Sequence, residues 1–245
     1  MRIVCLVPSL TELLFDLGLA KNVVGRTRFC IHPADRVEDV AIVGGTKNPN
    51  IDRIKQLSPD LIIMNKEENR KEDALLLEQV ADLLVTDINT IEDALISITE
   101  IAQRTGTNEA GKQLTNAINR ELKKAETFEP VTAAYLIWKK PYMTVGGDTY
   151  IHHVMDKWGL KNVFADDQRY PEITTDDLRR IAPQLILLSS EPYPFSAKHV
   201  SELEKEVPGS KPMLVNGEFF SWYGSRMLPA FRYLNRWRAE LGSVL

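Results

Sequence analysis

Four aromatic residues lie close together between Glu218 and Arg226, in the stretch EFFSWYGSR. Aromatic side chains combine a large apolar area with flat faces, so a group of them suits the burial and stacking of a flat or macrocyclic ligand. The carboxylate and the guanidinium at the two ends of the stretch suit the orientation of polar groups on such a ligand. The stretch therefore indicates either a corner of the hydrophobic core or a ligand-binding surface.

Other aromatic residues come directly after apolar runs that predict strands, and so they fall in expected loops. Core packing makes weak demands on loops, so aromatic residues gathered there favour ligand binding. The candidates for an aromatic ligand wall are Phe29, Trp138, Tyr142, Tyr170, Tyr193, Phe195, Phe219, Trp222 and Tyr223. Trp222 and Phe29 are the strongest candidates, whereas Phe220, beside an apolar run, is expected to fill the core.

Charged and amide side chains in the same loops are candidates for orienting a ligand. Arg and Lys suit carboxylates or phosphate on a chelate, and Glu191 and Glu218 can accept hydrogen bonds from amide groups. The candidates are Arg28, Lys47, Asn48, Arg70, Arg169, Glu191, Glu218 and Arg226. A charge in a loop is often only solvated, and Arg226 is as well placed to pair with Glu218 as to contact a ligand.

The four histidines do not predict a metal site of their own. His152 and His153 are neighbours on an expected helix, where adjacent side chains point about 100° apart, and neither has the i, i+4 partner of a helical zinc motif. His199 stands among Lys and Glu residues and is expected on the surface. Only His32, in a loop after an expected strand, is a candidate axial ligand to the metal of a bound chelate.

Composition and motifs exclude several classes of function. The 245 residues carry a net charge of −4, so no nucleic-acid partner is expected, and no run approaches the roughly 18 apolar residues of a membrane span. The glycine pairs at Gly44-Gly45 and Gly146-Gly147 lack the spacing of nucleotide-binding loops. No nucleophile motif indicates hydrolysis, so neither an enzyme nor a catalytic cofactor is predicted.

The first residues predict a strand and a helix and not a signal peptide. Ser9 and Glu12 form the S-x-x-E pattern of a capping box, which predicts a helix capped by Ser9. The sequence as it stands therefore predicts a cytoplasmic protein, or a periplasmic or surface-anchored one if a leader was removed. Cys5 and Cys30 form no disulfide framework.

Strand-like and helical patterns alternate along the chain, which predicts α/β lobes with largely parallel sheets. The expected strands are 3–7, 23–25, 61–64, 83–86, 134–137, 185–188 and 213–215. One long amphipathic helix is expected over 108–128, because its apolar residues recur at spacings of three and four.

The segments on either side of this helix repeat one another. GLAKNV at 18–23 matches GLKNV at 159–163, and in each the glycine is expected to end a helix. Residues 54–63 are echoed by 180–187, where each predicts a helix end, a Pro-containing turn and a buried strand. Asp148 is expected to cap the helix that opens the second repeat.

This repeat predicts two equivalent lobes, 1–106 and 130–245, joined by the single helix 107–129. Two lobes on one helix leave a cleft between them. Because ligands of parallel sheets bind at the carboxyl ends of the strands, the candidate side chains are expected to line this cleft. The protein is expected to be a monomer.

Four motifs, RIVCLVPSLTE, VVGRT, GGTKNPNIDRI and LSPDLII, follow one another along the first half of the chain. Their order resembles the helical-backbone (class III) substrate-binding proteins of cobalamin and ferric-siderophore ABC importers, in particular the vitamin B12-binding branch. The resemblance covers nearly the whole chain. It implies two α/β lobes bridged by a rigid helix and a corrinoid or iron chelate held between them.

The resemblance also assigns roles by position. Phe29 matches an aromatic residue that lies against the corrin, and Glu218 with Phe219 matches an acid–aromatic pair that lines the ligand. Asp52 matches an acid of the first lobe that docks on the permease, whereas no acid stands at the corresponding place in the second lobe, at 223–226. The segments 65–70 and 189–195 resemble a subgroup without an export signal.

The predicted function is therefore the non-catalytic binding of a metal-bearing ligand for an ABC permease. A corrinoid such as cobalamin is preferred, and a ferric siderophore or heme is the alternative ligand. The expected ligand-binding residues are Arg28, Phe29, His32, Lys47, Asn48, Arg70, Trp138, Tyr170, Glu191, Tyr193, Glu218, Phe219, Trp222, Tyr223 and Arg226. A cytoplasmic, chelatase-like enzyme or chaperone of tetrapyrrole metabolism, with His32 or Glu191 as the titratable group, is the alternative function.

Overall fold

The computed structural model describes residues 1–242, apart from the side chains of residues 126 and 127. Its internal contacts divide the chain into two compact units. The first unit contains Met1–Ala117 and Tyr223–Met227, and the second contains Ile118–Trp222 and the chain from Leu228 onward. The chain thus returns to the first unit for five residues near its end.

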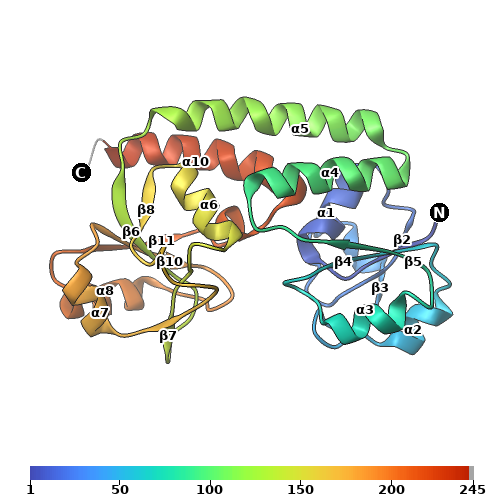
Figure 1. The fold of residues 1–245 in the computed structure, drawn as a ribbon, viewed down its shortest axis with the longest axis horizontal. Helices are drawn as coiled ribbons and strands as arrows, with labels where there is room; N and C mark the ends of the chain where they lie inside the picture. Colours follow the sequence, from blue (N-terminus) through green and yellow to red (C-terminus); the bar gives the residue numbers. More distant parts are fainter. Residues whose placement is uncertain (243–245) are drawn as a thin grey trace. The chain divides into compact units, whose positions relative to one another are not determined.

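The first unit is built on a parallel sheet with the strand order β3-β2-β1-β4-β5. Its strands are β1 (Ile3–Cys5), β2 (Val23–Arg26), β3 (Ala41–Ile42), β4 (Leu61–Asn65) and β5 (Asp82–Thr86). Its helices are α1 (Pro8–Asp16), η1 (Val37–Asp39), α2 (Ile51–Gln56), α3 (Lys71–Leu77), α4 (Ile91–Thr105), the first part of α5 (Asn108–Leu122) and η3 (Gly224–Arg226). Figure 1 shows α1 and α4 on one face of this sheet and α2 and α3 on the other.

The second unit is built on a parallel sheet with the strand order β11-β10-β6-β8 and a small antiparallel pair, β7-β9. Its strands are β6 (Val131–Leu136), β7 (Tyr142–Met143), β8 (Leu160–Asn162), β9 (Glu172–Ile173), β10 (Leu185–Ser189) and β11 (Lys211–Val215). Its helices are the end of α5, η2 (Lys123–Thr127), α6 (Tyr150–Lys157), α7 (Thr175–Ile181), α8 (Ala197–Glu206), α9 (Glu218–Ser221) and α10 (Met227–Gly242). In Figure 1, α7 and α8 cover one face of this sheet and α6 and α10 the other.

In each unit an apolar core holds one pair of helices against the sheet. These helices are α2 and α3 in the first unit and α7 and α8 in the second. In the first unit, Val4 of β1 and Leu6, two positions later, pack with Ile54 of α2 and Leu77 of α3. In the second unit, alternate residues of β6 and β10 pack with Leu178, Leu203 and Val207 of α7 and α8. Burial of one face at alternate positions fixes the register of each strand.

The internal repeat and the predicted parallel-sheet α/β fold are confirmed. The strand order β2-β1-β4-β5 of the first unit corresponds to β8-β6-β10-β11 of the second. Gly18 and Gly159 end equivalent helices with φ values of 86° and 65°, a conformation that glycine adopts without strain. The list of expected strands missed the two-residue strands β3, β7 and β9 and the three-residue strand β8, which are too short to show a periodicity.

Two helix starts differ from the prediction. Helix α1 begins at Pro8, and its N-cap residue Val7 makes no side-chain hydrogen bond, so Ser9 lies inside the helix and does not cap it. Proline suits this first position because a helix leaves the first N–H groups unpaired. Helix α6 is capped by Thr149 and not by Asp148, whose carboxylate accepts a hydrogen bond from the backbone of Arg169.

The long helix expected over 108–128 is shorter than predicted. Helix α5 ends at Leu122 and continues as the 3-10 turn η2. Its apolar stripe is confirmed at Ile118 and Ala125, which are both buried.

Candidate functional site

The candidate side chains follow the carboxyl ends of strands in both units, which is where ligands bind in parallel sheets. In the first unit, Arg28, Phe29 and His32 follow β2, Lys47 and Asn48 follow β3, and Arg70 follows β4. In the second unit, Trp138 follows β6, Tyr170 precedes β9, Glu191 and Tyr193 follow β10, and Glu218, Phe219 and Trp222 follow β11.

A group of partly exposed side chains in the second unit, which we call the Trp222 wall, consists of Glu191, Phe219, Ser221 and Trp222. The indole Nε1 of Trp222 donates to Oε1 of Glu191 at 2.9 Å, and the hydroxyl of Ser221 donates to the same oxygen at 2.8 Å. The ring of Phe219 packs on that of Tyr233, with 5.2 Å between centroids. Phe220 is fully buried, as the sequence predicts.

The loops after β10 and β11 are interlocked, because these two strands are parallel neighbours. Ser189 ends β10, and its hydroxyl donates to the carbonyl of Glu191 at 2.5 Å. The backbone N–H of Gly217 donates to the hydroxyl of Ser190 at 2.9 Å. A Cβ atom at Gly217 would lie 2.3 Å from Oγ of Ser189 and 2.7 Å from Cγ of Glu191, so only glycine fits.

Four rings form a second aromatic group in the same unit. Trp138, with 41% of its surface exposed, meets the ring of Tyr193 edge-on at 5.7 Å. Tyr193 in turn contacts Phe195 at 4.8 Å, and both contact the imidazole of His199. Trp138 is therefore the exposed end of a packed aromatic row.

His199, expected on the surface, has a structural role at the start of α8. Its Nδ1 accepts a hydrogen bond from the backbone N–H of Ser196 at 2.9 Å, which completes a capping box. This arrangement needs an unprotonated Nδ1. Desolvation, assisted by the positive charge of Lys139, lowers the pKa of the imidazole and favours this neutral form.

In the first unit, Phe29 is the exposed aromatic residue, with 53% of its surface accessible. Its backbone N–H donates to the hydroxyl of Thr27 at 3.2 Å, and its ring borders Gly45. Arg28 is exposed beside it. Burial raises the pKa of the Glu12 carboxyl, while Arg226 and, after it, the nearby His32 act in the opposite sense.

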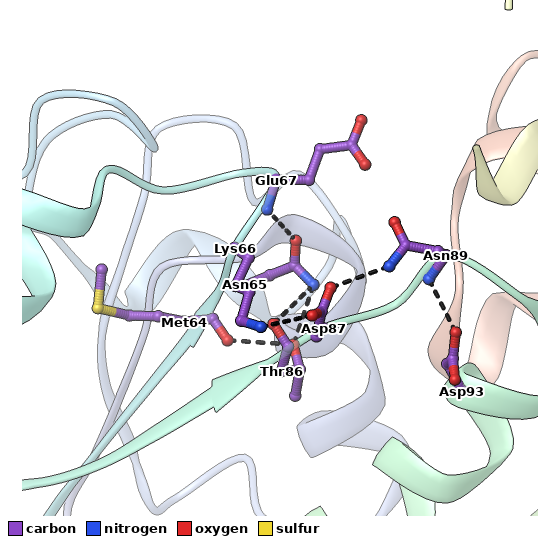
Figure 2. Close-up of polar contacts among 8 residues, drawn as sticks. All are labelled: Met64, Asn65, Lys66, Glu67, Thr86, Asp87, Asn89 and Asp93. Atoms are coloured by element: carbon purple, nitrogen blue, oxygen red, sulfur yellow. Dashed lines mark hydrogen bonds and ion pairs between the residues drawn. The ribbon is translucent and has the colours of Figure 1, made fainter. Parts of the chain in front are cut away.

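The segment 65–70 is held by two buried side chains, Asn65 at the end of β4 and Thr86 at the end of β5. The Asn65 side chain accepts from the backbone of Glu67 at 2.9 Å and donates to the hydroxyl of Thr86 at 3.1 Å (Figure 2). Lys66 pairs with Asp87 at 2.5 Å, and Asp87 also accepts from Asn89 (Figure 2). The loop is thus fixed to two neighbouring strands.

Lys47 and Arg70, two candidates for orienting a ligand, make contacts at this loop. The ammonium of Lys47 donates to the carbonyl of Glu67 at 2.5 Å. Arg70 makes a two-point ion pair with Asp73, in which each hydrogen bond measures 3.0 Å. Both cationic side chains remain exposed, so each can still meet a negatively charged group.

Tyr223 and Arg226 do not take the places that the sequence predicts. Both belong to the first unit. Tyr223 is only 6% exposed, and burial raises the pKa of its hydroxyl well above the ordinary value. Arg226 pairs with Glu12.

Tyr170 is half-buried, and the guanidinium of Arg169 lies 5.6 Å from its ring centroid. Arg169 in turn pairs with Asp148 at 3.9 Å. The segment is thus an exposed polar loop with one aromatic face.

The second unit carries an exposed acid at the position equivalent to Asp52 in the repeat. Helix α2, which carries Asp52, and helix α7 precede the equivalent strands β4 and β10. Asp176 stands at the same position of α7, and the two carboxylate side chains are 87% and 86% exposed. The repeat that matches 54–63 with 180–187 already indicates this equivalence. Extended back by a few residues, it aligns Asp52 with Asp176.

Residues 1–242 contain neither a cluster of metal ligands nor a membrane-spanning helix. In this part of the chain, no three His, Cys, Asp or Glu side chains are grouped so as to hold a metal ion. None of the helices in the same range is both long enough and apolar enough to cross a membrane.

Comparisons with known proteins match most of the chain. Residues 3–211 match the model of a family described as periplasmic binding protein. An uncharacterized ABC transporter substrate-binding lipoprotein, YvrC of Bacillus subtilis (strain 168), is 28% identical over 201 residues, which are 76% of this chain and 62% of that protein. The chain thus spans less than two thirds of that relative. A vitamin B12-binding protein of Pectobacterium carotovorum subsp. carotovorum is 26% identical over 243 residues, 94% of this chain and 85% of that protein.

Two solved structures share the fold. The periplasmic vitamin B12 binding protein BtuF of Vibrio cholerae has a TM-score of 0.83 and 20% identity, over 98% of this chain and 96% of that one. The periplasmic heme-binding protein BhuT, in complex with two hemes, has a TM-score of 0.83 and 20% identity, over 98% of both chains. At this identity the two structures establish the fold alone.

Proposed function

We propose that this chain, which belongs to the periplasmic binding protein family, is a substrate-binding protein of the type that serves ABC importers. Its ligand is a metal-bearing chelate, a corrinoid in preference to heme or a ferric siderophore. The observation that carries the proposal is the Trp222 wall, where an indole ring is held by a hydrogen bond to Glu191 at the carboxyl end of a parallel strand. The names of a relative and of two structural neighbours, which bind vitamin B12 or heme, support this ligand class.

In this proposal, affinity comes mainly from aromatic burial, and polar side chains orient the ligand. The aromatic contacts are Phe29, Trp138, Tyr170, Tyr193, Phe219 and Trp222. The orienting groups are Arg28, Lys47, Asn48, Arg70 and Glu218, with His32 as the candidate axial ligand to the metal. Tyr223 and Arg226 have no part in it, since one is buried and the other is engaged with Glu12.

We also propose that Asp52 and Asp176 dock on a permease. Both are exposed carboxylates at equivalent helix starts of the two units, so each suits pairing with a cationic group of a partner. The names of these similar proteins, which include the words periplasmic and lipoprotein, support a location outside the cytoplasm. This is one of the two locations that the sequence leaves open.

Titration with three ligands tests the proposal. Cyanocobalamin, hemin and a ferric siderophore are added to the purified protein, and binding is followed by calorimetry and ligand absorbance. We expect stoichiometric binding, tightest for cyanocobalamin, with each ligand recovered unchanged. Failure of all three to bind contradicts the proposal. Insertion of a metal ion into a metal-free tetrapyrrole would favour the chelatase-like alternative, which none of the relatives' names given above supports.

A further inference from the structure

The carboxylate of Glu191, which the sequence predicts to contact the ligand, is engaged inside the protein. One of its oxygens accepts hydrogen bonds from both Trp222 and Ser221. We infer that Glu191 is a positioning residue, which fixes the indole ring of Trp222 as a preformed flat surface for the ligand. The inference rests on the proposed function and gives Glu191 a role other than ligand contact.

The backbone that carries Glu191 is itself fixed. Its N–H and its carbonyl both bond to the hydroxyl of Ser189, the last residue of β10. Gly217 packs against its Cγ from the neighbouring loop. The carboxylate thus has a defined position before any ligand binds, and a charged acceptor makes a stronger hydrogen bond than a neutral one.

The orientation of Trp222 limits the chemistry that it can offer. Its single N–H donor is directed at Glu191 at 2.9 Å, and an indole has no second donor. Contact with a ligand at this ring is therefore by stacking and apolar burial, without a hydrogen bond. Such a surface favours a ligand with a broad flat face and tolerates variation in the ligand's peripheral groups.

Pre-organisation explains why a charged residue is placed behind an aromatic one. A surface ring that turns about its side-chain bonds loses that freedom when a ligand binds, which weakens binding. Because Glu191 already holds the ring in the folded protein, the loss of rotational freedom occurs on folding and not on ligand binding. Removal of Glu191 should therefore weaken ligand binding only as long as Trp222 is present.

The first experiment needs no ligand and uses the ¹⁵N–¹H signals of the four indole groups. The signal of Trp222 is identified by its absence in Trp222→Phe. We expect Glu191→Ala to shift this signal and speed its exchange with water, and Glu191→Gln, which keeps a side-chain oxygen, to restore it. The indole of Trp158, bonded to Asn235 at 2.9 Å, is the internal control and should not move.

The second experiment measures cyanocobalamin and hemin affinities for the same variants. We expect Glu191→Ala to weaken binding on the order of tenfold, Glu191→Gln to bind nearly as the unmodified protein, and Glu191→Ala with Trp222→Phe to bind as Trp222→Phe alone. An unchanged Trp222 signal in Glu191→Ala overturns the inference, as does an equal loss of affinity in the Trp222→Phe background, which would mean direct ligand contact. Failure of cyanocobalamin, hemin and the ferric siderophore alike to bind the unmodified protein would refute the proposed function, while the indole signals still decide whether Glu191 positions the ring.

Discussion

Arg226 and Glu12 form a two-point ion pair although 214 positions separate them in the sequence. The two hydrogen bonds measure 2.8 and 2.7 Å, and each side chain is only 14% exposed. The pair fastens η3 to α1, and this explains why residues 223–227 belong to the first unit while the residues on both sides belong to the second.

Loss of this pair should destabilise the protein. Arg226→Met leaves the Glu12 carboxylate without its cation in a site where burial already raises its pKa. We expect the free energy of unfolding to fall by about 3 kcal/mol, as measured by urea denaturation. Adding Glu12→Leu should recover part of the loss. Arg180→Met, which breaks an exposed pair with Asp177, is the control and should cost far less, because solvent screens an exposed pair. Equal effects of the two Arg variants would contradict a structural role for the pair.

Trp222 should contribute a measurable part of the ligand affinity. Trp222→Ala removes the flat face of the wall, and we expect a loss of about 1–3 kcal/mol in cyanocobalamin binding by calorimetry, the value of burying one large side chain. Trp222→Phe should lose less, because a ring remains. Ile96→Ala changes an apolar side chain that is 65% exposed on α4 and should not alter binding. Unchanged affinity in Trp222→Ala would remove this residue from the site.

Gly217 should tolerate no side chain. In Gly217→Ala the new Cβ meets Oγ of Ser189 and Cγ of Glu191, so one of the interlocked loops has to move. We expect a loss of about 1–3 kcal/mol in stability together with a shift of the Trp222 indole signal. Gly242→Ala, where no heavy atom lies within 4 Å of the added Cβ, is the matched control. If Gly217→Ala had the stability and the Trp222 signal of the unmodified protein, the loops would be loosely packed.

Stability should decrease at mildly acidic pH because of His199. Its pKa is lowered from 6.5 by desolvation and by Lys139 and Lys198, while Glu202 acts in the opposite sense. The unfolded chain therefore takes up a proton at a higher pH than the folded protein does. The contribution is complete above 6.5 and is lost as the pH falls from that value toward the lower folded pKa.

His199→Gln tests this dependence, because glutamine can accept the Ser196 N–H and does not titrate. Urea midpoints measured on either side of pH 6.5 should differ less in this variant than in the unmodified protein. An identical pH dependence in both proteins would assign the effect to other groups.

Asp52 and Asp176 should matter for transport and not for ligand binding. Charge reversal, Asp52→Lys or Asp176→Lys, removes an exposed carboxylate and should reduce uptake through the partner permease while the ligand Kd stays unchanged. Glu100→Lys, on the exposed side of α4, is the control for net charge. Normal uptake in the double variant would exclude docking through these acids.

The sequence alone determined the layout of the fold. Apolar runs and their spacing located seven strands, and the two GLxxNV-like endings and the repeated helix–turn–strand segments predicted two equivalent parallel-sheet units. These features are readable because they depend on neighbours a few residues away. The helix starts at Ser9 and Asp148 were wrong. Helix α1 begins at Pro8 after the apolar Val7, and Thr149, the neighbour of Asp148, caps α6.

The chemical roles of individual side chains were decided only by the tertiary structure. The sequence named Glu191, Trp222, Tyr223 and Arg226, yet the structure pairs the first two, buries the third and joins the fourth to Glu12. The sequence reasoning did not single out Asp176, although the internal repeat aligns it with Asp52. A charged or aromatic residue in a loop has many possible partners far along the chain, and only the folded arrangement selects one of them.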